Sequence, residues 1–341
     1  MRCRCWHNGL MPSRYRFTVL ALALVAALSG CSSANPSAPA STPAGSAPSS
    51  AQPSASTPES ISPTPSPSTS SQPPAASELP RGGREVFPTY RLFGYSGYPG
   101  APGQGRLGIG SLDARMTEIE KRGKSWTGGR KLLPVMELIA VTVHASPGKD
   151  GMYRTRAPEA VIKRWHDAAV KHKAMLLLNI QPGRADFIDE VKHFEKWLKY
   201  PDVGVALDPE WAVNKGQIPG RSFGSTTGAE LDQVSRYLSQ VVEANNLPEK
   251  VMLFHQLHVT IVKSPKALKQ HPGVVPINSV DGIGSPAQKI ATYKGVMKTR
   301  PSYVHAGFKI FFKEDVATGR RLITAKDVLS LKPQPEYILF E

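Results

Sequence analysis

Two acidic residues separated by one proline are the clearest chemical feature of the sequence, Asp208-Pro209-Glu210. In an extended segment, residues two apart face the same side with Cα atoms ~6.6 Å apart, and proline biases the residue before it toward that conformation. Two carboxyl groups this close push each other's pKa apart, which leaves one protonated and the other ionised. We therefore predict Glu210 as a general acid and Asp208 as its charged partner, as glycosidic bond hydrolysis requires. The alternative is that Asp208 braces the loop while Glu210 pairs with a surface lysine.

Further polar and aromatic residues fall at or near the ends of apolar segments. Glu137 and Asp281 are alternative partners for the acid. The residues expected to hold sugar hydroxyls and sugar faces are Tyr95, Gln181, Trp211, His255, Gln256 and Lys309. Carboxylates, amides and aromatic rings that converge on one place are typical of carbohydrate chemistry, in which one acid protonates the glycosidic oxygen and a second group stabilises positive charge on the sugar.

Strand-like and helix-like segments alternate between residues 81 and 341. The predicted strands are Arg91–Tyr95, Leu132–Val141, Ala174–Ile180, Val203–Asp208, Val251–Gln256, Val274–Val280, Tyr303–Phe312 and Tyr337–Phe340. The predicted helices are Asp113–Arg122, Pro158–His172, Ala185–Tyr200, Ala229–Asn245, Pro286–Lys298 and Thr324–Leu331. This order predicts an α/β fold, a (β/α)8 TIM-like barrel over residues 81–341, with a doubly wound open sheet as the competitor.

The predicted barrel would bring the polar residues together, because the loops that follow parallel strands share one face. Asp113 and Thr324 are expected as helix N-caps, and Pro158 and Pro286 suit the first turns of their helices. No helix is predicted after the eighth strand, so we expect the segment before Arg91 to cover that side of the barrel.

The segment Val203–Glu210 is similar to the catalytic strand of chitinase-like hydrolases and to the Asp-x-Glu of barrel-fold cell-wall muramidases. The chitinase pattern has further aspartates two and five positions before Asp208, where this chain has Ala206 and Val203. The muramidase pattern has an acid on the first strand, where this chain has the segment Leu92–Tyr95. The similarity therefore concerns the fold and the place of the acidic pair.

The domain as a whole resembles a group of actinobacterial secreted lipoproteins with a TIM-barrel, glycoside-hydrolase-like domain. The resemblance extends roughly from Leu92 to Lys289. It rests on the segments Asn179–Arg184, Ala206–Trp211, Gly216–Gly220 and Phe254–Gln256. It implies a barrel and export from the cell, and it implies no particular activity.

The first 80 residues predict a route out of the cell. Residues 1–30 combine a basic start, the apolar run Phe17–Leu28 and a small-residue ending before Cys31, which together favour a lipoprotein signal peptide. Cys31 is the predicted lipidation site, where acyl chains such as palmitate would anchor the exported protein to the outer face of the cell membrane. The alternative is an ordinary secretory signal, and translation from Met1 or Met11 fits equally. Residues 31–80 are rich in Pro, Ser, Thr and Ala and predict a disordered linker after the lipidated cysteine.

The chain is basic, with 42 Lys and Arg against 27 Asp and Glu and a formal net charge of +15. The basic residues are scattered and do not alternate with aromatic ones, so no nucleic-acid partner is expected. A cell-wall or extracellular polysaccharide, or an anionic envelope polymer, fits the charge better. A charge that only maintains solubility is the alternative. The sequence leaves the oligomeric state open.

Two motif-like patterns have plainer explanations. The G-x-G-x-x-G pattern at residues 103–108 lacks an acidic residue at the spacing that a dinucleotide site needs, so a flexible rim is expected there. His255 and His258 have no third ligand at a convincing spacing. We therefore expect no cofactor and no metal.

Two functional hypotheses follow. The first is an envelope-anchored lipoprotein with a glycoside-hydrolase-like barrel that acts on a cell-wall or extracellular glycan. The second is a lipoprotein that binds a glycan or an anionic polymer without catalysis. A structural envelope protein without a ligand is a third, weaker possibility.

Overall fold

The fold is a closed barrel of eight parallel strands, seen in a computed structural model that describes residues 76–341. The strands are β1 (Tyr90–Gly97), β2 (Lys131–Val143), β4 (Met175–Ile180), β5 (Val203–Leu207), β7 (Lys250–Gln256), β9 (Val274–Val280), β10 (His305–Ile310) and β11 (Tyr337–Phe340). They pair in parallel in chain order, and β1 pairs with both β2 and β11, which closes the sheet. The predicted TIM-like barrel is therefore confirmed, and the open doubly wound sheet is not formed.

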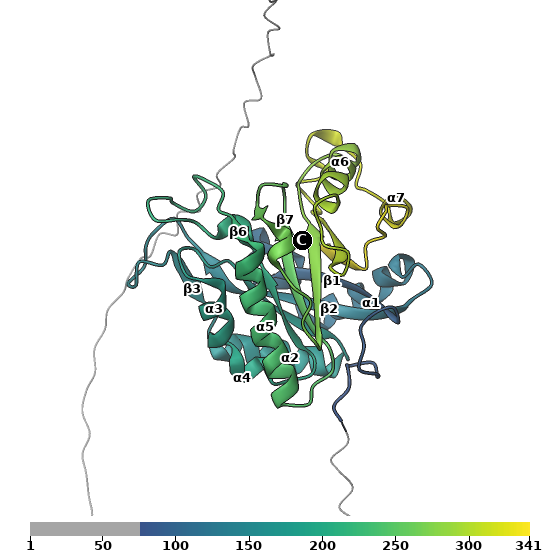
Figure 1. Ribbon diagram of the computed structural model, residues 1–341. Helices are drawn as coiled ribbons and strands as arrows, with labels where there is room; N and C mark the ends of the chain where they lie inside the picture. The colour runs from purple at the N-terminus through teal and green to yellow at the C-terminus, as the bar shows by residue number, and fades with distance from the viewer. Residues whose placement is uncertain (1–75) are drawn as a thin grey trace, which may run out of the picture. The chain divides into compact units, whose positions relative to one another are not determined.

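Helices lie outside the barrel, with α2, α3, α4 and α5 grouped on one side and α6 and α7 together on another (Figure 1). They are α1 (Leu112–Gly123), α2 (Glu159–Lys171), α3 (Phe187–His193), α4 (Glu195–Leu198), α5 (Gly228–Ala244), α6 (Pro286–Met297) and α7 (Ala325–Leu329). Capping boxes at Thr227, Ser285 and Thr324 define three of the helix starts, because each side chain accepts from the backbone N–H three residues on.

The predicted helix starts are partly right. Thr324 caps α7, and Pro286 is the first residue of α6. The prediction of Asp113 as an N-cap is wrong, because the Ser111 side chain accepts the hydrogen bond from the α1 backbone. Pro158 directly precedes α2 and does not lie in its first turn.

Shorter elements lie at the end of the barrel where the strands finish. β3 (Arg154–Arg156) pairs antiparallel with the extended end of β2. Within residues 257–273 the chain forms no α-helix between β7 and β9. It forms instead β8 (Val262–Lys263), which pairs with β6 (Thr226–Thr227), and a 3-10 turn at Pro265–Ala267.

Side chains that alternate along each strand divide the core into an inner and an outer part. The inner cluster holds Leu79, Val86, Tyr90, Leu92, Leu133, Val135, Met175, Leu177, Ala206, Val251, Leu253, Val275, Ile277, Tyr337 and Leu339. Small residues at other inward positions make room for them, and a Cβ on Gly94 would lie 2.0 Å from the Val135 carbonyl oxygen. Each large apolar side chain buried here contributes about 1.5–3 kcal/mol.

The segment before β1 closes the end of the barrel where the strands begin. Leu79 and Val86 belong to the inner cluster, and the Arg81 guanidinium donates to the carbonyls of Leu132 and Lys173, which lie at or just before strand starts. The expectation that this segment covers the side of the missing helix is therefore wrong. That side is covered by aromatic rings, since Phe340 on β11 packs 4.9 Å from Phe312 and 5.3 Å from Trp126 between ring centroids.

The predicted signal peptide, Cys31 and residues 32–75 of the predicted linker lie outside the described residues. Over residues 76–341, no helix is long and apolar enough to cross a membrane.

Candidate functional site

A layer of polar side chains lies above the apolar inner cluster, at the end of the barrel where the strands finish. It follows from the strand alternation, because for each of the eight strands the residue two positions after the last inward apolar or glycine residue is polar. These residues are Ser96, Glu137, Asn179, Asp208, His255, Ser279, Lys309 and Glu341. We call them, with the neighbouring Glu210, Asp281 and Tyr337, the polar layer. All but Glu341 are buried, and the Glu341 side chain is 23% exposed.

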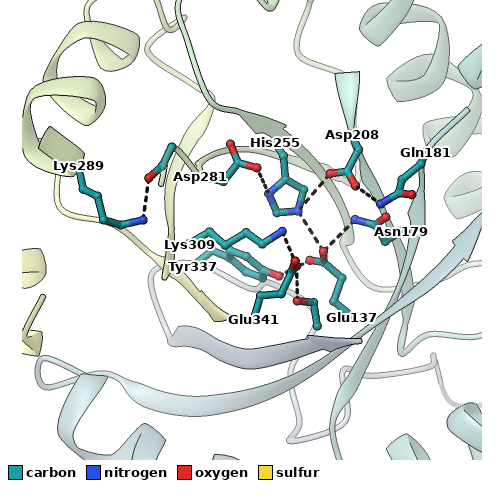
Figure 2. Close-up of polar contacts among 12 residues, drawn as sticks. Glu137, Asn179, Gln181, Asp208, His255, Asp281, Lys289, Lys309, Tyr337 and Glu341 are labelled. Carbon is teal, nitrogen blue, oxygen red and sulfur yellow. Dashed lines mark hydrogen bonds and ion pairs between the residues drawn. The ribbon is translucent and has the colours of Figure 1, made fainter. Parts of the chain in front are cut away.

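His255 and Glu137 form the centre of the polar layer (Figure 2). His255 Nε2 lies 3.0 Å from Glu137 Oε1, which also accepts from the Asn179 amide at 2.9 Å. The Tyr337 hydroxyl donates to the other Glu137 oxygen at 2.5 Å. Burial opposes ionisation of Glu137, but the charges of His255 and Lys309 and the hydrogen bonds outweigh it and lower the pKa of Glu137 to about 2. Glu137 is therefore an ionised group whose two oxygens are both occupied.

His255 carries the matching positive charge. Burial lowers the pKa of His255, but the charges of Glu137 and Asp208 outweigh burial and raise it above the ordinary value. His255 Nε2 also lies 3.9 Å from Asp208 Oδ1, and Nδ1 lies 3.8 Å from Asp281 Oδ2. One imidazolium thus faces three carboxyl groups and binds one of them closely.

Lys309 is the second buried cation. Its Nζ lies 2.7 Å from Glu341 Oε2, and the Ser96 hydroxyl donates to the same oxygen at 2.8 Å. Burial lowers the pKa of Lys309, but the surrounding carboxylates, Glu341 first, raise it above its ordinary value. Lys309 is therefore a fixed charge, which argues against a role as an amine nucleophile.

The remaining acids, Asp208, Glu210 and Asp281, are held differently from Glu137. Burial raises the pKa of Asp208 to about 6, although His255 and Lys309 oppose the rise. Burial and the neighbouring Asp281 and Asp208 raise the pKa of Glu210 well above its ordinary value. Burial also raises the pKa of Asp281, against the effect of His255 and Lys309. Glu210 therefore keeps its proton to a higher pH than an ordinary glutamate, beside an Asp208 that is largely ionised at neutral pH.

The backbone that carries Asp208 and Glu210 differs from the prediction. β5 ends at Leu207, and Pro209–Trp211 form a 3-10 turn where an extended segment was expected. Both acids are nevertheless buried, and Asp208 and Asp281 are the main charged neighbours of Glu210. The alternative of a Glu210 side chain paired with a surface lysine does not hold, because Glu210 is 6% exposed.

Several buried polar atoms of the layer have no hydrogen-bond partner in the protein. They are Asn179 Oδ1, Asp208 Oδ1, Glu210 Oε2, His255 Nδ1, Ser279 Oγ and Asp281 Oδ1. A buried polar atom left unpaired costs about 1–3 kcal/mol. A group of such atoms in one place therefore indicates that the layer can bind a polar ligand.

The other predicted substrate-binding residues divide between the layer and the outer face. Gln181 donates to Asp208 Oδ2 at 3.3 Å and accepts from the Val143 N–H, so it positions Asp208. Trp211 is half-buried in the turn that carries Glu210. Lys309 is in the layer, as described.

Tyr95 and Gln256 do not reach the layer, and their predicted role beside the acids is not supported by their positions. Tyr95 lies in the outer core, where its hydroxyl donates to Glu118 and accepts from Arg122. Gln256 is on the side of β7 that faces the outer core, and it accepts from Asn278 and donates to the His258 carbonyl. Both residues occupy the alternate, outward positions of their strands.

Five residues of the layer had no role in the predicted site: Ser96, Asn179, Ser279, Tyr337 and Glu341. Four of them could have been found from the alternation, since Ser96, Asn179, Ser279 and Glu341 each stand two positions after an inward residue. Tyr337 is different, because it starts in the apolar cluster and only its hydroxyl reaches Glu137.

Other candidate sites lie away from the layer. A surface hollow of about 820 Å³ is lined by Leu107, Trp165 and Lys171 among others and includes no residue of the layer. The glycine pattern at residues 103–108 forms two 3-10 turns packed on the end of β1, where a Cβ on Gly108 would lie 1.9 Å from the Tyr98 carbonyl oxygen. Among residues 76–341, no group of three or more His, Cys, Asp or Glu side chains has the geometry to hold a metal ion.

Comparison with models of known protein families and with curated protein sequences gave no match to this chain. The barrel and the polar layer are therefore the basis on which a function can be argued.

Proposed function

We propose that residues 81–341 are a glycoside-hydrolase-like domain that acts on a cell-wall or extracellular glycan, with Glu210 as general acid and Asp208 as its charged partner. One observation carries the proposal. Two neighbouring carboxyl groups are buried together at the finishing end of the barrel, with the pKa of Glu210 raised well above its ordinary value and that of Asp208 raised to about 6. Paired acids whose environments hold protons to different degrees can divide acid and base work at one pH.

In the proposed reaction Glu210 gives its proton to the glycosidic oxygen as that bond breaks. Asp208 stabilises the positive charge that develops on the sugar, and water then supplies a hydroxyl to the sugar carbon and returns a proton to the acid pair. Gln181 and the His255 imidazolium hold Asp208 in place.

The contacts of Glu137 favour a supporting role over that of partner for the acid. Both of its oxygens already accept hydrogen bonds, from His255, Asn179 and Tyr337. Asp281 has an unpaired oxygen and lies beside Glu210, so it is the better second candidate.

The experiment is glycan cleavage by Glu210→Gln, measured as new reducing ends from purified wall glycans. We expect turnover to fall by about 10²–10⁴-fold while the fold is kept, because the amide cannot donate an acidic proton. The matched control is Glu249→Gln, at the opposite end of the barrel, where a carboxyl oxygen accepts from the Val86 N–H and an amide oxygen can replace it. Wild-type turnover in Glu210→Gln would falsify the assignment.

Binding without turnover is the second candidate. It is favoured by Ala206, which lies in the apolar inner cluster at a position where the chitinase-like pattern carries an aspartate. Retention of a glycan by the wild type without any product would support binding over hydrolysis. The many carboxyl groups of the layer give no support to an anionic polymer as its occupant.

We also propose export and anchoring through lipidated Cys31, supported by the signal-like residues 1–30 and the linker composition. In the native host, the full chain is expected to partition into the detergent phase, and Cys31→Ser to be found in the aqueous phase. Equal partitioning of the two proteins would contradict the anchor.

A further inference from the structure

The charges of the polar layer are unbalanced. It contains the carboxyl groups of Glu137, Asp208, Glu210, Asp281 and Glu341 and the cations His255 and Lys309. Both cations are already engaged, because His255 contacts Glu137 at 3.0 Å and Lys309 contacts Glu341 at 2.7 Å. The nearby buried cation Lys289 contacts Asp315 at 3.0 Å and is engaged as well. Asp208 and Asp281 are left with only longer contacts to His255, at 3.9 Å and 3.8 Å.

The unpaired atoms of the layer show the same imbalance. Each of the three remaining acids has one buried oxygen without a hydrogen-bond partner, and Asn179 Oδ1 is a fourth such acceptor outside the acidic set. Asn179 is 1% exposed and its amide nitrogen is engaged with Glu137. The unpaired groups of the layer that can donate a hydrogen bond are the His255 Nδ1 ring nitrogen and the Ser279 hydroxyl. Among its unpaired atoms the layer therefore has more acceptors than donors, and both of its cations are already paired.

We propose that the polar layer recognises a glycan unit that bears a free primary ammonium group, that is, an amino sugar without its N-acetyl group. This inference rests on the proposed function and specifies its substrate. An ammonium supplies three N–H donors and one positive charge, which matches the three unpaired oxygens Asp208 Oδ1, Asp281 Oδ1 and Asn179 Oδ1. Glu210 is not counted among them, because the proposed reaction needs its proton. A neutral sugar hydroxyl brings one donor and no charge, and an acidic sugar adds a like charge to the carboxylates already present.

The arrangement also distinguishes the ammonium from its acetylated form. N-acetylation removes the charge and two of the three donors, and it adds a carbonyl acceptor and a methyl group. In a site short of donors, these changes leave buried carboxyl oxygens unpaired, which is the situation in which recognition sites discriminate strongly.

The test compares two soluble oligosaccharides of equal length, chitosan oligomers with free amines and fully N-acetylated chitin oligomers. Binding to Glu210→Gln is measured by calorimetry, so that cleavage does not consume the ligand. The free-amine oligomer is expected to bind at least 10-fold more tightly. Equal affinity, tighter binding of the acetylated oligomer, or no binding of either would overturn the inference.

A second variant locates the effect. In the Asp281→Asn protein the ratio of the two affinities is expected to fall toward one, whereas Glu249→Gln should keep the wild-type ratio. An unchanged ratio in Asp281→Asn, with the fold intact by circular dichroism, would contradict recognition by these acids. Turnover separates this inference from the hydrolase proposal. If the wild type retains free-amine oligomers without releasing product, the hydrolase proposal fails and the ammonium preference stands.

Discussion

The two halves of the barrel interior are built on the same alternation of side chains and are filled with opposite chemistry. Where the strands begin, inward positions carry Leu, Val, Ile and Met, and the segment before β1 adds Leu79 and Val86. Where they finish, the inward positions carry acids, amides and two cations, several with unpaired atoms. The apolar half therefore stabilises the fold, and the polar half costs stability in return for chemistry, as functional sites commonly do.

The largest effect on stability is expected from breaking the ion pair between Glu137 and His255 in the polar half. Glu137→Gln should lower the free energy of unfolding by about 3–5 kcal/mol, because it leaves the His255 imidazolium buried without its partner. Urea unfolding at neutral pH measures the change. A loss below 1 kcal/mol would mean that the polar half does not rely on this pair.

The apolar half should respond in stability alone. Leu133→Ala, two inward positions below Glu137, is expected to cost about 2–5 kcal/mol by creating a cavity. Glycan turnover per folded molecule should stay within about twofold of wild type. A large loss of turnover in a fully folded Leu133→Ala protein would show that the apolar half also affects the chemistry of the polar half.

A change of pH should alter the stability contributions of Asp208 and Glu137 in opposite directions, because one pKa is raised and the other is lowered. The pKa of Asp208 is raised from 3.8 to about 6, so its contribution to stability is present below about pH 4 and is lost as pH rises through 6. The pKa of Glu137 is lowered from 4.5 to about 2, so its contribution is present above pH 4.5 and is lost as pH falls toward 2. Burial of Glu210 and Asp281 acts in the same direction as burial of Asp208.

We therefore expect Asp208→Asn to remove part of the fall in stability between about pH 4 and 6, by an amount on the order of 1–3 kcal/mol. Thermal or urea unfolding across this pH range measures it. An Asp208→Asn curve parallel to that of wild type would indicate that Asp208 titrates normally.

The smallest effect is expected on the outer face. Tyr95→Phe removes the hydroxyl between Glu118 and Arg122 and should cost about 1 kcal/mol of unfolding free energy. Turnover and glycan affinity should not change, because this side chain points away from the polar layer. A defect in glycan binding would restore the role that the sequence suggested for Tyr95.

The barrel could be predicted from the sequence because each strand is a largely apolar run and most crossovers contain a helical pattern, some with start signals such as Thr324. The members of the polar layer were harder to predict, because they depend on which residues of each strand face the inside of the barrel. Tyr95 and Gln256 stand one position away from inward residues, and that single step puts them outside. Tyr337 could not be found from spacing, since its hydroxyl meets Glu137 only because the barrel closes, with β1 paired to β11 on one side and to β2 on the other.

The protonation of Glu210 tests the central claim most directly. In a carbon-13 NMR titration of side-chain carboxyl groups, the signal that vanishes in Glu210→Gln is assigned to Glu210, and in the wild type it should titrate well above the ordinary glutamate value of 4.5. If the Glu210 signal instead titrates at or below 4.5, Glu210 is not held as an acid and the proposed chemistry is contradicted.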